Sequence, residues 1–291
     1  MTKSMAPAIR RMLGCCWIGV LAIVSVSTCV AAEVRTYTMA IVPQMQIDNV
    51  EQAWKPVVER IAQDAGIKIQ LQLYPSIPQF ESAFLAGSPD FVYLNPYHQV
   101  MAKRAQGYIP LVRDGSSLLT GVLVVRRDSP IHTVQDLDGK KIAFPAPLAF
   151  GASLYMRVLL GELYRLNITP GYVGNHDNVI RDVLAGEVAA GGTVRSVLQR
   201  KPLALRDQLR VVYETPAVAP HPLSAHPRIP RAVQDKVVAS MLGMAGDKEG
   251  ASLLEAVMLP RPVKADYGRD YARLEQINLK KYLPSPAADT K

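Results

Sequence analysis

The chain has 291 residues, of which 49% are hydrophobic and 20% are charged, and its formal net charge is +8 at pH 7. This balance of apolar and charged residues is that of a globular protein and excludes an intrinsically disordered chain. The basic residues are scattered and form no stripe with interleaved aromatic side chains, so we expect no nucleic acid as a partner.

The first 32 residues have the three parts of an export signal. Lys3, Arg10 and Arg11 give a positive start, a mainly apolar run follows, and small residues lead up to Ala32. This order predicts a signal peptide that is cleaved after Ala32, and therefore an exported protein. Two alternatives stay open: a membrane anchor, since the run approaches the roughly 20 residues that span a bilayer, and lipid attachment at Cys29.

The cysteines support an exported chain that needs no thiol chemistry. All three, Cys15, Cys16 and Cys29, lie in the predicted leader. A chain cleaved after Ala32 therefore contains none, which excludes a disulfide framework, a thiol nucleophile and a cysteine metal site. Cleavage also removes 3 of the 33 basic residues, so that 30 remain against 25 acidic ones in 259 residues. This mild basic surplus is compatible with an anionic ligand.

Strand-like and helix-like segments alternate along the chain, which predicts an α/β fold with mainly parallel sheets. The strands that we expect are 35–42, 67–74, 90–94, 111–113, 118–126, 141–144, 188–193 and, as the last one, 209–214. Apolar residues at helical spacing predict helices over 48–65, with Asp48 as the N-cap, and over 78–86, 150–164, 175–185, 231–244, 248–257 and 272–282. Five prolines between 216 and 230 indicate one long irregular connection.

Motifs of catalysis and of cofactor binding are missing from the sequence. The five histidines show no metal-type helical spacing, and those in the proline-rich connection, His221 and His226, are expected to be exposed. There is no glycine-rich nucleotide loop and no serine-hydrolase elbow. No pair of carboxylates stands out as acid and base. We therefore expect neither a cofactor nor a bound metal, and we do not expect an enzyme.

Three stretches carry a resemblance to a known family. They are Ile41-Val42-Pro43-Gln44 with the helix that holds Trp54 and Pro56; Asp90-Phe91-Val92-Tyr93-Leu94-Asn95-Pro96-Tyr97; and the series 136–144, Asn175-His176-Asp177 and 183–191. In this order they resemble the phosphate/phosphite/phosphonate family of ABC-transporter substrate-binding proteins. The resemblance covers most of the chain beyond the leader, and it is the shared order of the motifs that carries it.

The resemblance implies the two-lobed fold of a type 2 periplasmic binding protein, in which each lobe is a mainly parallel sheet flanked by helices and two crossover strands act as a hinge. Residues 1–32 would be the signal peptide, 33–120 and 215–291 the first lobe with the C-terminal helices, and 121–214 the second lobe. The crossovers would be 118–125 and 209–214.

The resemblance also implies a function. A monomer would capture a small polar or anionic solute, of the phosphonate, phosphite or oxyanion-like class, and present it to an ABC permease. A receptor that presents its ligand to a membrane sensor kinase would use the same fold. An enzyme on this fold is a third alternative, which the leader and the missing acid–base pair argue against.

Ligands of open α/β sheets bind beyond the carboxyl ends of the strands, where loops lead into helix N-termini that favour anions. Each candidate there also has an ordinary structural interpretation, such as a core position for Tyr93 and Phe150, a turn for Asn95, a helix cap for His176, or a place in the strand ladder for Thr120. The ligand-binding residues that we predict are Gln44, Tyr93, Asn95, Tyr97, Thr120, Phe150, Gly151, Ser153, His176 and Thr193.

The chain departs from the family in a way that bears on the ligand. Relatives that bind phosphonates place serine and threonine hydroxyls at the helix start where this chain has 145–153, and only Ser153 offers one. An acidic residue common in the family is Thr193 here, with Arg195 two residues on. Each lost hydrogen bond removes roughly 0.5–1.5 kcal/mol. We therefore expect a less charged or more apolar ligand, or another oxyanion, and not phosphonate itself.

Overall fold

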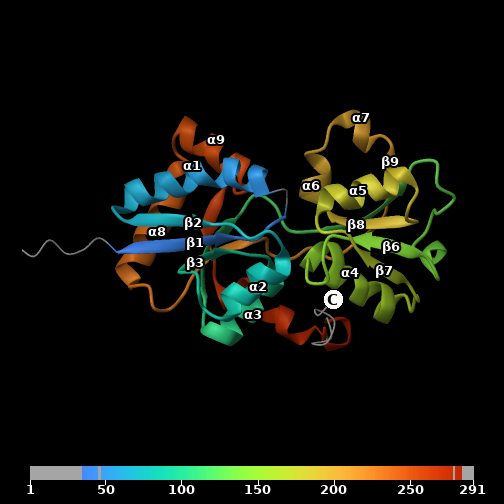
Figure 1. Ribbon diagram of the computed structural model, residues 1–291, viewed down its shortest axis with the longest axis horizontal. Helices are drawn as coiled ribbons and strands as arrows, with labels where there is room; N and C mark the ends of the chain where they lie inside the picture. Colours follow the sequence, from blue (N-terminus) through green and yellow to red (C-terminus); the bar gives the residue numbers. More distant parts are fainter. Residues whose placement is uncertain (1–34, 45–46, 278, 284–291) are drawn as a thin grey trace, which may run out of the picture. The chain divides into compact units, whose positions relative to one another are not determined.

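The computed structural model describes residues 35–44, 47–277 and 279–283. The predicted signal peptide and Cys29 lie outside this part of the chain. The described residues belong to one compact unit that contains two β-sheets (Figure 1). In this part of the chain, no helix has both the length and the apolar character needed to cross a membrane.

The first sheet has the strand order β11-β4-β10-β3-β1-β2. Its β1 pairs in parallel with β2 and β3, whereas β10 and β11 run antiparallel to their neighbours. In chain order the strands are β1 (Thr36–Ile41), β2 (Lys68–Gln72), β3 (Phe91–Tyr93), β4 (Ile109–Asp114), β10 (Pro222–Ala225) and β11 (Pro262–Lys264).

Helices cover both faces of the first sheet (Figure 1). The group on one face is α1 (Ile47–Ala65), α8 (Arg231–Met244) and α9 (Lys248–Ala256), and the group on the other is α2 (Ile77–Leu85) and α3 (Pro96–Gln106). In α1 the buried residues follow the helical spacing that the sequence predicted, from Val50 through Trp54 to Ala65. We call the first sheet with these helices the first lobe.

The second sheet has the strand order β7-β6-β8-β5-β9. Its strands are β5 (Gly121–Arg126), β6 (Lys141–Phe144), β7 (Thr169–Tyr172), β8 (Ala190–Val194) and β9 (Leu209–Glu214). Parallel pairs join β6 to β7 and β8, and antiparallel pairs join β5 to β8 and β9. We call this sheet with its helices the second lobe.

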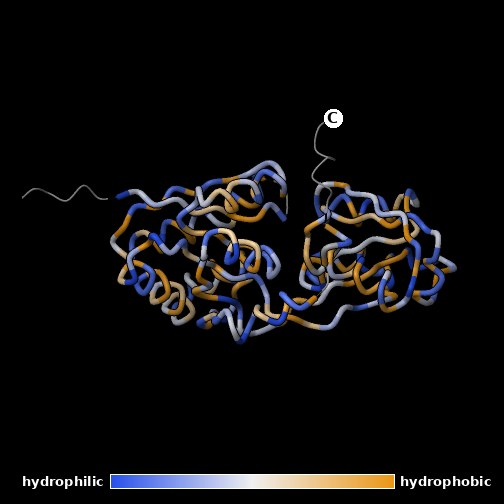
Figure 2. The backbone as a smooth tube through the Cα atoms, turned by 90° about the horizontal axis from the view of Figure 1, so that it is seen from below, coloured by the Kyte–Doolittle hydropathy of each residue, from blue (hydrophilic) through white to orange (hydrophobic). Residues whose placement is uncertain are grey.

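Both faces of the second sheet are buried, which explains the continuous apolar run of β5. Alternate residues of a strand point to opposite faces. Val122 and Val124 pack with α5 (His176–Ala185), whereas Leu123 and Val125 join the cluster on the other face, which includes Met156 of α4 (Tyr155–Val158). Figure 2 shows segments of high hydropathy running through the interior of both lobes.

Short elements complete the described chain. They are η1 (Gln135–Leu137), the π-helical turns η2 (Phe150–Leu154) and η3 (Leu159–Leu163) that flank α4, then α6 (Arg195–Gln199), α7 (Leu203–Arg206), α10 (Tyr267–Asp270), η4 (Ala272–Gln276) and η5 (Lys280–Tyr282). The helix expected over 150–164 is thus helical throughout but tightens into α-helix only in its middle.

Two segments join the lobes, and they run side by side. Leu119 and Val218 form an antiparallel bridge with backbone N–O distances of 2.8 and 3.0 Å. Beside it, the Gly121 N–H donates to Thr215 Oγ1 and the Thr215 N–H donates to the Gly121 carbonyl, both at 2.9 Å. The pairing couples the two connections, so that a rotation of one lobe against the other would bend both together. The residue boundaries predicted for the lobes stay a prediction.

Several local expectations differ from the structure. The proline-rich connection contains β10, and β9 is not the last strand, since β10 and β11 follow it. Both sheets are mixed, with parallel pairs only around β1 and β6. Helix α1 already includes Ile47, so Asp48 lies in its first turn and is not the N-cap. Short strands that begin at a proline carry too little apolar pattern to be recognised from sequence.

Candidate functional site

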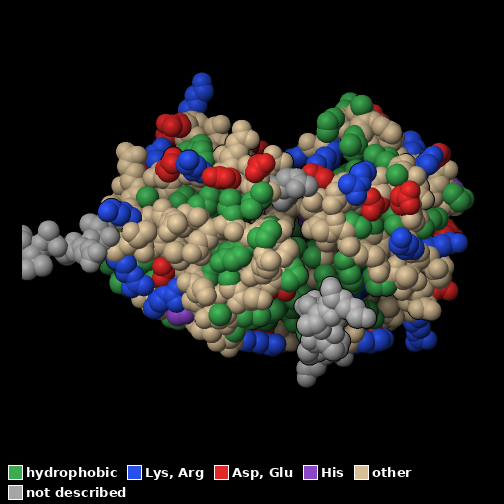
Figure 3. All heavy atoms as spheres, viewed as in Figure 1, with side chains coloured by type: hydrophobic (Ala, Val, Ile, Leu, Met, Phe, Trp, Pro, Cys, Tyr) green, Lys and Arg blue, Asp and Glu red, His purple; other side chains and the backbone are tan. Residues whose placement is uncertain are grey.

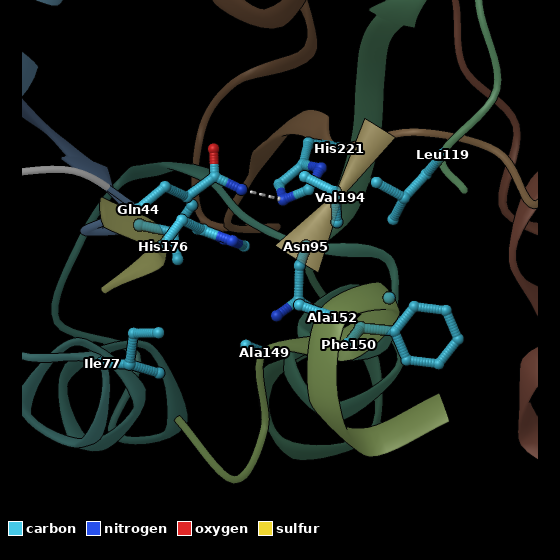
Figure 4. Close-up of a pocket in the computed structure, with 12 residues that line it drawn as sticks. Gln44, Ile77, Asn95, Leu119, Ala149, Phe150, Ala152, His176, Val194 and His221 are labelled. Atoms are coloured by element: carbon cyan, nitrogen blue, oxygen red, sulfur yellow. Dashed lines mark hydrogen bonds between the residues drawn. The ribbon is translucent and has the colours of Figure 1, made fainter. Parts of the chain in front are cut away.

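A pocket lies where the strand ends of the two lobes face each other (Figure 4). Val42 and Gln44 follow β1, Asn95 follows β3, and His176 opens α5 after β7. The described lining residues are Val42, Gln44, Ile77, Asn95, Leu119, Ala149, Phe150, Gly151, Ala152, His176, Val194 and His221. Both lobes therefore supply walls of the same pocket, at the edge where open α/β sheets bind ligands.

Three polar side chains gather on one side of the pocket, namely Gln44, His176 and His221 (Figure 4). The Gln44 Nε2 atom lies 2.6 Å from His221 Nε2. Because an amide nitrogen can only donate, the Nε2 of His221 is the acceptor and carries no proton. The imidazole of His221 also stacks on the ring of Tyr93, with 5.6 Å between the centroids.

The Asn95 side chain lines the pocket and also makes hydrogen bonds within the first lobe and to the second lobe. Its Oδ1 accepts from the N–H groups of Tyr97 and His98 at 2.9 and 2.8 Å, which makes it the N-cap of α3. Its Nδ2 donates across to the carbonyl of Leu148 in the second lobe at 3.0 Å. The turn expected at Asn95-Pro96 is therefore a helix start with proline in the first helical position, where its missing N–H does no harm.

His176 presents a hydrogen-bond donor to the pocket. Its Nδ1 lies 2.9 Å from the Oγ1 of Thr193, which is fully buried. Within the described residues that hydroxyl has no other partner, so it donates its proton to Nδ1. The imidazole proton is then on Nε2, the other ring nitrogen. The helix cap beside it is Asn175, whose Oδ1 accepts from the Asn178 N–H at 2.9 Å.

Both histidines of the pocket are uncharged at neutral pH. Burial lowers the pKa of His176 to about 4; Asp177 raises this pKa and Lys201 lowers it, both by smaller amounts. Burial also lowers the pKa of His221 to about 3, and the proximity of the His98 and His176 imidazoles lowers it further. The twelve described lining residues include no lysine, arginine, aspartate or glutamate. The pocket therefore offers polar groups without a full charge.

Backbone donors come from the start of the helical segment in the second lobe. The N–H groups of Phe150, Gly151 and Ala152 have no acceptor among the described residues, as expected for the first turn of a helix. No serine or threonine is among the described lining residues. Ser153 is fully buried outside the lining, and its Oγ lies 3.2 Å from the donating Nε of Arg157.

The remaining predicted residues lie around the pocket. Tyr97 stacks on Phe150 at 6.2 Å between centroids and so supports the pocket wall. Tyr93 is buried and lines a neighbouring cavity together with Gln44. Thr193 acts on the pocket through His176. Thr120 is half-buried in the connection between the lobes, where its carbonyl accepts from the N–H of Arg195 at 2.9 Å.

The expectation that His221 is exposed is wrong, because only 7% of its surface is accessible. It immediately precedes β10, which runs antiparallel to β3. The amino end of β10 therefore lies beside the carboxyl end of β3 and brings His221 to the edge where Asn95 lies. The four residues of β10, Pro222–Ala225, are all buried, but so short a segment with a serine inside it gave no signal in the sequence. His226 is half-buried.

Solved structures share this fold. A binding-protein component of an ABC phosphonate transporter from Pseudomonas aeruginosa is 12% identical, with a TM-score of 0.75 over 84% of this chain and 86% of the other. PhnD1 from Prochlorococcus marinus, solved with methylphosphonate, is 16% identical, with a TM-score of 0.74 over 84% and 97%. A Xanthomonas citri protein solved with ATP is 17% identical, with a TM-score of 0.70 over 85% and 98%.

The fold and the pocket between two α/β lobes define a type 2 periplasmic binding protein. Residues 39–271 match the family model described as "ABC transporter, phosphonate, periplasmic substrate-binding protein", and the chain belongs to this family. No curated protein matches the chain. The family consists of solute-binding components of ABC importers, so the predicted resemblance and the predicted fold class are confirmed.

Proposed function

We propose that the protein captures a small polar solute of the phosphonate, phosphite or oxyanion-like class and presents it to an ABC permease, and that the group of the solute bound in this pocket carries at most one negative charge. The observation that carries the proposal is the pocket in which Gln44, Asn95, His176 and His221 meet. Its donors are the His176 imidazole and the unpaired N–H groups at 150–152. A solute with acceptor oxygens matches such a set.

The charge limit follows from the uncharged lining. A buried charge needs a partner of opposite sign or several hydrogen bonds, and a second charge on the same group raises that requirement. Hydrogen bonds from a few neutral donors can hold one negative charge, whereas a dianion would need more donors or a cation. The hydroxyl cluster with which relatives of this family hold phosphonates has no counterpart in the lining. We therefore expect singly charged oxyanions to bind better than doubly charged ones.

Binding requires the lobes to separate and close again. The space in the pocket that the centre of a water molecule could reach is about 20 Å³, which is room for one water. A phosphonate or a larger solute enters only if the walls from the two lobes move apart. The paired connection at Leu119 and Val218 is where we expect the chain to bend.

A panel of solutes tests the proposal. We would titrate the mature protein with phosphite, methylphosphonate, phosphate and sulfate and follow the melting temperature and the heat of binding. A solute at 100 times its dissociation constant should stabilise the protein by about 2.7 kcal/mol. The variant His176→Gln should lose binding, while the matched variant of an exposed histidine, His132→Gln, should keep it. If no oxyanion of the panel raises the melting temperature, the proposed ligand class is wrong.

The rest of the proposal concerns how the protein works in the cell. We propose that it is cleaved after Ala32, acts as a periplasmic monomer and catalyses no reaction. The family description names a transport component, and no observation favours the alternative of a receptor for a membrane sensor kinase. On the face drawn in Figure 3, basic and acidic side chains are intermixed. Mass spectrometry of the exported protein would give the cleavage site and show whether Cys29 carries a lipid.

A further inference from the structure

A second cavity adjoins the pocket and shares four of its lining residues, Gln44, Leu119, Val194 and His221. Measured in the same way as the pocket, its volume is about 280 Å³. The hydrogen-bonded side chains of Gln44 and His221 line both spaces. A solute that displaces one of these two side chains could extend from the pocket into the larger cavity.

Donors line the second cavity. Tyr93 is only 4% exposed, and its hydroxyl has no hydrogen-bond partner among the described residues. Arg200, which follows α6 in the second lobe, reaches the first lobe, where its guanidinium donates to the carbonyls of Glu255 and Ala256 at the end of α9. The Glu255 carboxylate is 3.9 Å from this guanidinium and its side chain is 71% exposed. Both side chains line the cavity, so an anionic group would compete with the Glu255 carboxylate for the Arg200 guanidinium.

Met258 lines the same cavity in a conformation that favours glycine. Its φ is +62°, and it follows Val257, the C-terminal cap of α9. The N–H of Met258 donates to the carbonyl of Glu255, and that of Leu259 donates to Leu254, which is the glycine-favouring C-terminal helix motif. A side chain in this left-handed conformation is strained. Such strain is expected where the side chain itself is needed.

We propose that the second cavity is a subsite for an extension of the solute that ends in a carboxylate or a similar anionic group. The group would accept hydrogen bonds from Arg200 and from the Tyr93 hydroxyl, and the thioether of Met258 would pack against the linking carbons. The inference rests on the proposed function, because it assigns the other end of the solute to the pocket with His176. The solute would then carry one negative charge at each end, and only the outer charge would meet a cation.

Three probes test separately what each end of the solute contributes to the affinity. Methylphosphonate has the head alone, propylphosphonate adds an apolar extension, and 3-phosphonopropionate adds one that ends in a carboxylate. We expect 3-phosphonopropionate to bind the mature protein about tenfold more tightly than methylphosphonate, the lower end of what a charge-assisted hydrogen bond contributes. Propylphosphonate should gain less affinity over methylphosphonate than 3-phosphonopropionate does. Isothermal titration in mildly acidic buffer, where the head is mainly singly charged, gives the three affinities.

Variants assign the gain to the cavity. In Arg200→Gln the ratio of the affinities of 3-phosphonopropionate and methylphosphonate should fall towards one. In Arg181→Gln, which changes an exposed arginine of the same lobe, this ratio should stay as in the wild type. Met258→Gly should raise the denaturant concentration needed for unfolding, because glycine relieves the left-handed strain. The same variant should weaken binding of both extended probes, a combination that a purely structural role of Met258 does not produce.

The outcomes distinguish the two proposals. If methylphosphonate binds but 3-phosphonopropionate binds no more tightly, the subsite is wrong and the proposed function stands. The subsite is also wrong if Arg200→Gln leaves the ratio of affinities as it is in the wild type. If none of the three probes binds, the proposed ligand class is wrong, and the subsite inference goes with it.

Discussion

Acid should destabilise this protein well above the pH at which its carboxylates titrate. Burial lowers the pKa of His176 to about 4 and that of His221 to about 3, whereas an unfolded histidine titrates near 6.5. Below pH 6.5 the unfolded chain therefore binds protons that the folded chain does not, so the free energy of unfolding falls as the pH falls. The stability that the two neutral histidines contribute is fully present above the unfolded pKa of 6.5, and it is lost as the pH falls towards their folded pKa values.

The size of the effect follows from the two pKa values. Each histidine contributes about 1.4 kcal/mol for every pH unit below 6.5 until its folded pKa is reached. At pH 5 the two together should lower the free energy of unfolding by roughly 4 kcal/mol. Domains of this kind are stable by about 5–15 kcal/mol, so the loss is a large part of the total. Half-buried His226, whose pKa burial also lowers, adds to it.

Urea unfolding between pH 7.5 and pH 5, followed by tryptophan fluorescence of Trp54, measures this loss. The double variant His176→Gln, His221→Gln should unfold at nearly the same urea concentration across this range, although it starts from a lower stability. The exposed histidine variant His132→Gln should behave like the wild type. Equal slopes of stability against pH in the double variant and the wild type would refute the assignment to these two histidines.

Three further substitutions, with Gly243→Ala as a control, test the pocket and the packing around it. Gly151→Ala should change the stability by no more than about 0.5 kcal/mol in thermal unfolding, because the new Cβ would lie 3.4 Å from Val194 and 3.5 Å from Leu119. The same methyl group should abolish solute binding in calorimetry, because it fills the pocket. Gly192→Ala should destabilise the fold by about 1–3 kcal/mol, because its Cβ would overlap the carbonyl oxygen of Ala152. The control Gly243→Ala, whose Cβ meets no atom within 4 Å, should be neutral or stabilising in thermal unfolding. Asn95→Ala should lower the urea midpoint by removing the cap of α3, a loss of about 1–2 kcal/mol; an unchanged midpoint would show that the cap contributes nothing.

The sequence predicts those parts of the fold whose signal is local. The bounds of β6, β9 and α8 agree with the segments expected from alternation and helical spacing. The strand β10 could not be predicted, because its pairing with β3 and β4 depends on a chain reversal across more than a hundred residues. The preceding prolines also break the pattern by which strands are recognised.

In the candidate site too, some residues have a local signal in the sequence and others are brought to the site only by the fold. Gln44 and Asn95 were predictable because each lies just beyond a predicted strand, and His176 because it lies at the start of a predicted helix. Thr193 was selected for a contact with the ligand, and in the structure its hydroxyl orients His176. Arg200 and Met258 stand in segments with no site motif, and only the fold brings them to the cavity beside His221.

The uncharged pocket also bears on how the protein selects its solute. A lysine or arginine in the lining would attract every anion, including the abundant dianions, through a long-range field. Neutral imidazoles and backbone N–H groups act only at hydrogen-bond distance, so they reward a solute whose acceptors match their positions and penalise one that brings a second charge into a site without a cation. Because both histidines remain neutral down to mildly acidic pH, this discrimination depends on the charge of the solute and not on that of the protein. On the proposed function, a lining without serine or threonine hydroxyls would hold an oxyanion less tightly and would select it by its charge state.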